Sequence, residues 1–371
     1  MRVRLEEVCK RIYAGGDVPK DRYSEVMTEE YSVPIYANAE KDNGLYGYTD
    51  KAREEELSIT VAARGTIGFT AIRREPFFPV VRLITVVPDI EKVSERYLYY
   101  VLKNCKPQSS GTSIPQLTIP DIKKNSLELY SISKQESIAN QLDKVNRVIE
   151  LRKQELNSLD CIIKARFVEM FGSIFDNKYG YDVMTLQEVC ELIKDGTHQT
   201  PTYTEDSVNG VKFLSSKDVV SGEVDWHHLK YIPKELHNEL YKRISPKKGD
   251  ILLAKNGTTG IAAIVDRDEV FDIYVSLALL RPLDMVTSEY LCSALNSIET
   301  KHQFDGSLKG IGVPNLHLGE IKKTRIIVPP IKTQEQFAGF VHQVDKSKVA
   351  VQKALDETQM LFDSLMQEYF G

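Results

Sequence analysis

The sequence predicts an α+β protein, a tandem duplication of a strand-rich mixed domain followed by a long helix. Two observations lead to this prediction. Residues 135–171 contain no glycine or proline and place apolar residues in alternating steps of four and three, which is a heptad pattern. In addition, Gly111–Gly172 aligns with Gly310–Gly371 without a gap, so the heptad pattern occurs twice.

The repeat divides the chain into four segments. We expect a first strand-rich domain over residues 1–133, a central helix over 134–172, a second strand-rich domain over 173–332 and a C-terminal helix over 333–371. Two domains of ordinary size account for most of the chain, and the residues left over are enough for two long helices.

The first domain should begin with a short amphipathic segment that ends at Gly15-Gly16. Short β-like runs follow, at SVPIY, LSITVAA, TIGFTAI and PVVRLITVV, with turn-forming residues at 42–44, Gly65 and Gly68. Residues 94–103 look helical.

The central helix should start at a capping box formed by Ser133 and Glu136 and stop at Gly172, over about 55 Å. Arg152 and Arg166 interrupt its apolar seam. The other seam positions are Ile138, Leu142, Val145, Ile149, Leu156, Leu159, Ile163 and Met170.

The second domain repeats this plan with VKFL, GDILLA, GIAAIV, IYVSLALL and a helix over 288–300. In the C-terminal helix, Lys348 and Thr358 interrupt the seam. Its apolar positions are Phe337, Val341, Val344, Val351, Leu355, Phe362, Leu365 and Tyr369. The two helices should pair as an antiparallel coiled coil with a pseudo-twofold axis, which suits a partner of twofold symmetry. The alternative is that the helices are only a scaffold.

The composition shows no domain-wide basic surface of the kind that marks many nucleic-acid-binding proteins, so any nucleic-acid contact must come from local clusters or from a partner. The chain has 48 Lys and Arg against 53 Asp and Glu, a net charge of −5. No stretch looks long and apolar enough to cross a bilayer, and there is no apolar signal run. The five cysteines form no CxxC pair, and Cys9 and Cys190 occupy equivalent apolar positions. Buried thiols and a reducing cytoplasm are therefore expected.

Signatures of catalysis are missing. There is no GxxxxGK[ST], GxGxxG, HExxH or GxSxG motif. The run 88–92, PDIEK, resembles a nuclease motif, but its carboxylates are too close together, which favours a solvated turn. His227 and His228 would point to opposite faces of a strand, which makes them a poor metal pair. We expect a chain that is not an enzyme and holds no metal or cofactor.

Polar, basic and aromatic residues gather instead at glycine turns. ARGTIG (63–68) and KNGTTG (255–260) fall at the same point of each repeat, and their side chains suit base edges and phosphates. Closing a hairpin would explain the glycines equally well. The predicted DNA-binding residues in these and neighbouring segments are Lys41, Asn43, Tyr46, Tyr48, Arg64, Thr66, Arg73, His198, Thr200, Tyr203, Ser215, Ser216, Lys217, Lys255, Asn256 and Thr258.

With these motifs the chain resembles the specificity (S) subunit of Type I restriction–modification enzymes. The resemblance rests on the duplication, DGTHQTPTY followed by VKFLSSKDV, KGDILLAKNGTTG, and the LGEIKK and VPPI motifs that lead into QEQ and the terminal helix. IYANAEKDNGLYGYT and AARGTIGFT of the first domain match more loosely.

The resemblance implies two target-recognition domains, each reading one half of a split double-stranded DNA site. The paired helices would fix the unread spacer and dock two methyltransferase (M) subunits, which carry S-adenosylmethionine. Translocating and cleaving (R) subunits would join them for restriction. The alternatives are a specificity subunit of a methylation-only system, a silent recombination cassette, and a coiled-coil scaffold that binds protein rather than DNA.

Overall fold

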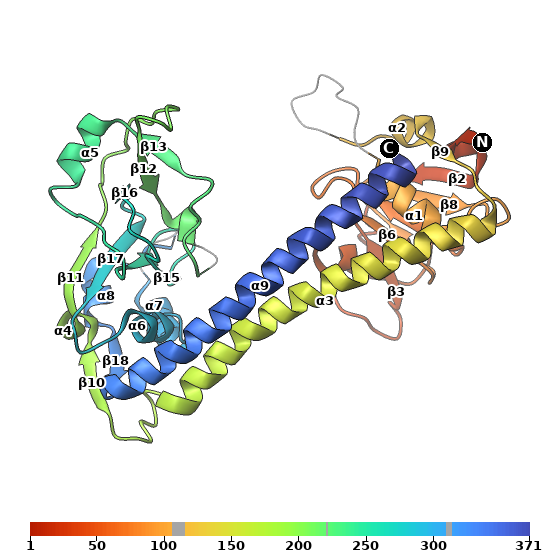
Figure 1. Ribbon diagram of the computed structural model, residues 1–371. Helices are drawn as coiled ribbons and strands as arrows, with labels where there is room; N and C mark the ends of the chain where they lie inside the picture. The colour runs from red at the N-terminus through yellow and green to blue at the C-terminus, as the bar shows by residue number, and fades with distance from the viewer. Residues whose placement is uncertain (106–115, 220–221, 309–313) are drawn as a thin grey trace. The chain divides into compact units, whose positions relative to one another are not determined.

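The structure is a computed structural model that describes residues 1–105, 116–219, 222–308 and 314–371. The aligned glycines Gly111 and Gly310, at which the repeat begins, lie outside the described residues. The chain divides into two compact units, one formed by 1–153 with 352–371 and the other by 154–351. Each unit therefore contains one strand-rich region and one part of each long helix (Figure 1).

The strand-rich region of the first unit has three sheets, with the strand orders β1-β9, β2-β8-β5-β6 and β4-β3-β7. Its strands are β1 (Arg2–Arg4), β2 (Cys9–Ala14), β3 (Val33–Tyr36), β4 (Leu45–Thr49), β5 (Ser58–Val61), β6 (Thr70–Arg73), β7 (Phe78–Pro79), β8 (Ile84–Pro88) and β9 (Ser126–Glu128). Its helices are α1 (Glu95–Lys103) and α2 (Ile119–Lys124), with single 3-10 turns η1 (Leu5–Glu7) and η2 (Lys41–Gly44).

The second unit repeats the same three sheets, β10-β18, β11-β17-β14-β15 and β13-β12-β16. Its strands are β10 (Asp182–Thr185), β11 (Cys190–Asp195), β12 (Val211–Leu214), β13 (Lys230–Ile232), β14 (Ile251–Ala254), β15 (Ala262–Ile264), β16 (Phe271–Ile273), β17 (Leu277–Pro282) and β18 (Arg325–Val328). Its helical segments are α4 (Leu186–Val189), η3 (Ser216–Val219), α5 (Lys234–Leu240), α6 (Ser288–Leu295), α7 (Ile298–Ser307) and α8 (Leu318–Lys323). The predicted duplication is confirmed strand by strand.

The long helices are α3 (Ile132–Phe171) and α9 (Ile331–Phe370), and they pair. In the first unit Tyr369 donates to Gln141 at 2.9 Å, so the end of α9 meets the start of α3. In the second unit Phe167 packs edge-on against Phe337 at 5.6 Å, which joins the end of α3 to the start of α9. The predicted antiparallel direction follows from these two contacts.

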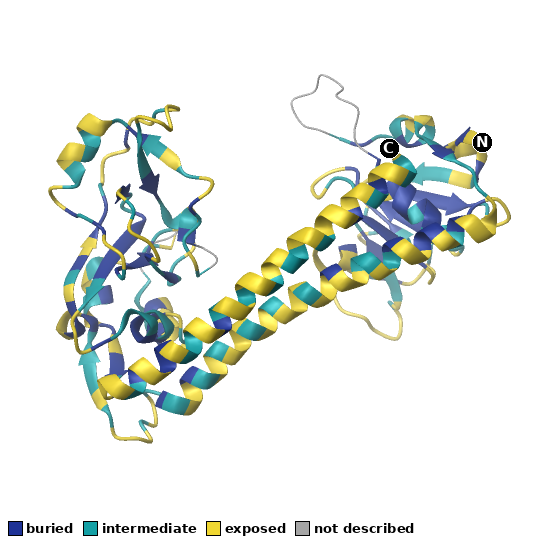
Figure 2. Cartoon of the chain, in the orientation of Figure 1, coloured by how far each residue is buried: buried dark blue, intermediate teal, exposed yellow. Residues whose placement is uncertain are grey.

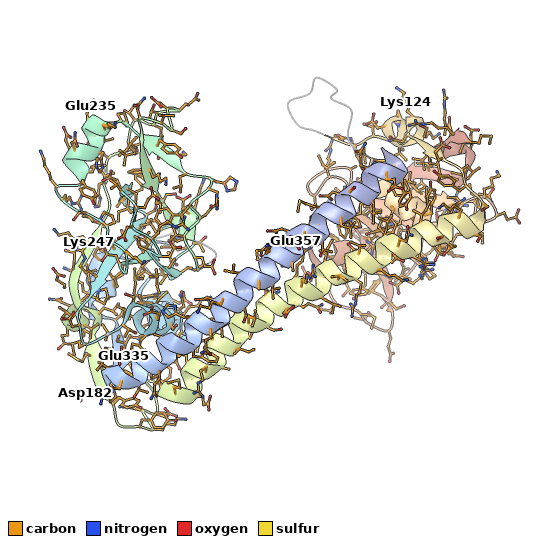
Figure 3. All side chains as sticks on the ribbon, viewed as in Figure 1. Lys124, Asp182, Glu235, Lys247, Glu335 and Glu357 are labelled. Carbon is orange, nitrogen blue, oxygen red and sulfur yellow. The ribbon has the colours of Figure 1, made fainter. Side chains whose placement is uncertain are left out.

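Burial follows the heptad seam, as the alternating colours of the helices in Figure 2 show. All predicted seam residues of α3 and α9 are buried or half-buried. The polar interruptions are also used: Arg152 donates to the Ala354 carbonyl and the Thr358 hydroxyl, and Lys348 pairs with Asp160 at 2.5 Å. Glu335 and Glu357, labelled in Figure 3, lie on the exposed side of α9.

Several predicted element boundaries were wrong. Ser133 does not cap α3, because the helix already starts at Ile132 and the hydroxyl of Ser131 accepts the Lys134 N–H at 3.4 Å. Glu136 instead accepts a hydrogen bond from Ser94 on the globular region. The predicted stop is confirmed, since Gly172 has φ +74°.

Three further segments differ from the prediction. The opening segment forms β1, η1 and β2. The run 79–87 is divided between β7 and β8, because Val81 and Arg82 take positive φ angles of 52° and 62°. The helix predicted over 288–300 is two helices, because Ser297 caps a new one by accepting the Thr300 N–H at 3.3 Å.

The sheets of the two units are covered differently. In the second unit β14 is buried on both faces: Ile251 and Leu253 face the core around Phe337, while Leu252 and Ala254 face a second core around Trp226. In the first unit, Ile59 and Val61 of β5 face the apolar core, whereas the buried Thr60 faces polar side chains. This polar layer determines the position of one predicted site residue.

Helix α1 in the first unit and helix α6 in the second each contact the adjoining long helix through a pair of polar side chains. In the first unit Arg96 of α1 lies 2.9 Å from Asp143 of α3. In the second unit Glu289 of α6 lies 3.1 Å from His342 of α9. The two pairs occupy equivalent places of the repeat with the acidic and basic residues exchanged.

Candidate nucleic-acid interface

The repeated glycine turn has the same backbone in both units. It follows β5 in the first unit and β14 in the second, where Gly65 and Gly257 have φ +67° and +77°. The turn is closed by the Gly68 N–H donating to Ala62 O at 2.9 Å and by the Gly260 N–H donating to Ala254 O at 2.8 Å. Positive φ favours glycine because it lacks a Cβ. The two turns therefore have equivalent backbones.

In the first unit this turn exposes Arg64 and Thr66. The Arg64 guanidinium donates to Gln116 Oε1 through Nε at 2.9 Å and Nη2 at 2.6 Å. These bonds use two of the five N–H groups of the guanidinium, so Arg64 retains donors for another acceptor.

The second loop of the first unit is η2 and the start of β4. Lys41, Asn43 and Tyr46 are exposed there, and Tyr48 is half-buried. The Tyr46 ring contacts Tyr23, with centroids 5.7 Å apart. Exposed aromatic and cationic groups of this kind suit contacts with bases and phosphates.

Arg73 forms hydrogen bonds both to this loop and to strand β5. Its side chain is buried: Nε donates to the Thr60 hydroxyl at 3.1 Å, Nη2 donates to Asn43 O at 2.7 Å, and Cζ lies 3.6 Å from the Tyr36 ring centroid. Burial lowers the pKa of the guanidinium. In this position Arg73 supports the loop that carries Asn43.

In the second unit the site is organised around Asp195, which the sequence analysis did not single out. Asp195 ends β11, and Lys255 directly follows β14. Both strands run antiparallel to β17 and flank it, so the two residues lie at one edge of the sheet. The Lys255 Nζ lies 3.7 Å from Asp195 Oδ2, and both side chains are buried.

Arg243 and His198 contact the same carboxylate. Arg243 Nη2 donates to Asp195 Oδ1 at 3.0 Å and to its carbonyl at 3.1 Å, and His198 Nε2 lies 3.0 Å from Oδ2. His198 and Arg243 remain exposed, with side-chain exposures of 66% and 47%. Asp195 thus contacts two exposed side chains, those of Arg243 and His198, and one buried lysine at the sheet edge.

Tyr203 and the 215–217 segment lie on neighbouring parts of the second unit. Lys230 Nζ lies 4.2 Å from the centroid of the exposed Tyr203 ring. The Ser215 N–H and hydroxyl both donate to Asp218 Oδ2, at 2.6 and 3.1 Å. Burial raises the pKa of Asp218, while the hydrogen bonds from Ser215 oppose that shift.

The remaining predicted residues differ in accessibility. Thr200, Lys217 and Thr258 are exposed, whereas Ser216 and Asn256 are half-buried. The Ser216 N–H donates to the Ser276 hydroxyl at 3.0 Å.

Among the described residues of the first unit, the Asp195 cluster has no counterpart, because Ala14 stands in the place of Asp195 and Ala63 in the place of Lys255. Sequence reasoning missed Asp195, Arg243, Gln116 and Lys230. Asp195 could have been found, because it ends β11 where the matching strand β2 ends in Ala14. Arg243 and Lys230 lie outside the motifs that the sequence analysis recognised.

Across residues 1–105, 116–219, 222–308 and 314–371, no group of three or more His, Cys, Asp or Glu side chains could hold a metal ion. Burial raises the pKa of the Cys9 and Cys190 thiols to about 12, in keeping with the predicted apolar positions. Within the same described ranges, no helix is long and apolar enough to cross a membrane. The 88–92 segment forms the predicted turn, with Lys92 3.0 Å from Asp89.

The chain is similar to a known protein family and to several of its members. The Type I restriction modification DNA specificity domain matches residues 1–160 and again 178–358. A putative type I specificity subunit of Mycoplasma pneumoniae is 34% identical over 165 residues, 42% of this chain and 49% of that protein. The EcoBI specificity subunit of Escherichia coli is 22% identical over 385 residues, 95% of this chain and 79% of that protein.

The matched region spans about half the length of the first Mycoplasma relatives, 49% and 45%. Among solved structures, the S subunit from M. genitalium has a TM-score of 0.53 at 14% identity, over 100% of this chain and 96% of that chain. A chain from a structural study of complex assembly in the type I R-M system has a TM-score of 0.56 at 16% identity, over 100% and 97%. These structures share the fold. Because the family match covers both strand-rich regions, the chain belongs to the Type I restriction modification DNA specificity family, as a specificity (S) subunit.

Proposed function

We propose that the chain gives a Type I restriction–modification complex its DNA sequence specificity. Each strand-rich domain reads one half of a bipartite double-stranded DNA site, and the paired helices set the spacer between the halves. The observation that carries this proposal is the duplicated glycine turn, which has one backbone but different side chains in the two units. A shared scaffold with different reading groups suits two unlike half-sites.

The cluster around Asp195 supports reading by the second domain. Base edges in the major groove present acceptors to Arg and other donors. Asp195 holds Arg243 and His198 in place while leaving both exposed, which reduces the cost of ordering them on DNA. In the first domain Arg64, Lys41 and Tyr46 take the equivalent role.

The long helices support docking of two copies of one partner, the methyltransferase (M) subunit. Exposed apolar pairs lie outside the seam at equivalent repeat positions, Cys161 with Ile162 on α3 and Met360 with Leu361 on α9. Exposed apolar groups of this kind mark contact surfaces. The M subunits supply S-adenosylmethionine and the methylation chemistry, and translocating and cleaving (R) subunits join for restriction.

The test is base-modification mapping of DNA from cells that express the chain together with an M subunit. We expect one methylated bipartite sequence with a constant spacer. The chain purified alone should transfer no methyl group from labelled S-adenosylmethionine, and adding the M subunit should restore the transfer. Methylation without sequence preference, or transfer by the isolated chain, would contradict the proposal.

A further inference from the structure

The first turn of α3 contains a glutamine that is fully buried. Gln135 has 0% exposure, and its Oε1 accepts the Ser94 N–H at 2.8 Å. Its Nε2 donates to Lys92 O at 3.1 Å and to Tyr130 O at 2.9 Å. The amide therefore connects the start of α3 to the segment that enters α1 and to the strand exit before α3.

The same arrangement occurs in the second unit. Gln334, in the first turn of α9, also has 0% exposure, and its Oε1 accepts the Thr287 N–H at 2.9 Å. Its Nε2 donates to Met285 O at 3.0 Å and to Pro329 O at 2.8 Å. Every partner is the repeat equivalent of a partner of Gln135.

These bonds are directional, unlike the apolar contacts around them. Glutamine is rarely fully buried, and each amide here uses its acceptor and both donors on backbone groups. Removing the side chain would remove three hydrogen bonds to the backbone at each of the two positions. An apolar core would resist separation of domain and helix equally well, but it would permit small rotations. Hydrogen bonds in three directions oppose such rotations.

The neighbouring side chains differ between the two joints. Arg96 pairs with Asp143 in the first, and Glu289 with His342 in the second. The glutamine and its backbone partners are present at both joints. A function common to both units is therefore assigned to the glutamine.

We infer that Gln135 and Gln334 are positioning residues that hold each recognition domain at a set angle on its helix, and so make the complex selective for one spacer length. This inference rests on the proposed function. The glutamines are buried and therefore do not contact DNA themselves. They determine the preference for one spacer length and leave the recognised half-site bases unchanged.

The experiment uses the complex of the full chain with its M subunit, and duplexes that carry the mapped half-sites with the native spacer or one base pair more or less. Gln135→Met and Gln334→Met keep the side-chain volume and remove the hydrogen bonds. We expect the preference for the native spacer to fall about tenfold in each, equivalent to about 1.4 kcal/mol. The preference for the correct half-site bases should stay at the parent value.

The exposed Gln154 of α3 and Gln336 of α9 provide matched controls, Gln154→Met and Gln336→Met, which should behave like the parent. If a methionine variant does not fold, Gln135→Glu and Gln334→Glu are measured instead, since they keep the acceptor and lose both donors. Variants that fold and keep the parent's spacer preference would overturn the inference. A parent complex without any bipartite site would instead overturn the proposed function.

Discussion

At the scale of single residues, the repeated turn carries one cation in each unit, at neighbouring but not equivalent positions. Arg64 is exposed and bound to Gln116, whereas Lys255 is buried against Asp195. Arg64→Ala should weaken DNA binding by about 1–3 kcal/mol if its contact is to a base edge. Lys255→Ala should weaken binding and also lower the melting temperature, because Asp195 loses a buried partner. Competition binding and thermal unfolding of the complex with the M subunit measure both.

Two kinds of control variant distinguish a loss of DNA binding from a loss of folding stability in the Arg64 and Lys255 variants. Lys247, exposed and outside the turn (Figure 3), provides a neutral variant, Lys247→Ala. Gly65→Ala and Gly257→Ala should chiefly lower thermal stability, because φ is positive at both. If Arg64→Ala and Lys255→Ala both bind the mapped site like the parent, the turns are structural only.

Glu136 gives a pH-dependent prediction. A hydrogen bond from the Ser94 hydroxyl, and then the Arg96 guanidinium, lower the pKa of this carboxyl below its usual 4.5. A lowered folded-state pKa stabilises the protein above the unfolded value, and this stabilisation is lost as pH falls through the folded value. Glu136→Gln should therefore lower the melting temperature at pH 7, with a difference that shrinks below about pH 4.5. A difference that is constant with pH would contradict the assignment.

The residue types and turns of the candidate site could be predicted from the sequence, but their burial could not. Arg73 and Lys255 have side chains suited to DNA, yet both are buried because Thr60, Asn43 and Asp195 provide polar partners inside. Such partners come from distant strands. Only the assembled sheets bring them together.

At the scale of elements, the helix seam predicts a contrast in stability. Leu142 is fully buried in the core of the first unit, whereas Val148, less than two turns further along α3, is exposed. Leu142→Ala should lower the free energy of unfolding by about 2–5 kcal/mol. Val148→Ala should change it by about 0.5 kcal/mol or less. Chemical denaturation measures both, and equal losses would mean that the seam does not determine stability.

The proposed measuring role of the helices predicts the effect of an insertion. Four residues added near Leu156 lengthen α3 by about 6 Å and turn it by about 40° beyond a full turn. Because four residues nearly restore the apolar stripe, the protein should still fold. On DNA that rises about 3.4 Å per base pair, the spacer should grow by one or two pairs while the half-sites stay the same.

Modification mapping of the insertion variant checks this outcome. Four residues inserted after Asn177, in the segment between α3 and β10, serve as the control and should leave the spacer unchanged. Altered half-sites with the old spacer would refute the measuring role and would locate specificity in the helices.

Element prediction succeeded where a single periodicity dominates. The seam predicts α3 and α9 to within two residues at either end. It failed where a continuous apolar run serves two sheets, as in IYVSLALL, which β16 and β17 share across a turn at 274–276. Apolar content alone does not show where a strand leaves one sheet for the next.

At the scale of the whole molecule, the duplication allowed the fold class to be predicted from one sequence. Gln135 and Gln334 were visible as an identical pair in the repeat. Their hydrogen bonds were not visible, because the partners are backbone groups of any residue type. The identical glutamines in the repeat mark the position as important in both units. Their hydrogen-bond partners are seen only in the structure.

The exchanged charges at the two joints have a consequence for assembly. A duplicated chain contains two similar globular regions and two similar helices, so each region could nucleate on the wrong helix while the chain folds. In such a mismatched product, Glu289 would face the Asp143 carboxylate and Arg96 would face the His342 imidazole, and both attractive pairs would be lost. We expect the two pairs to favour the packing of each region on its own helix over packing on the other.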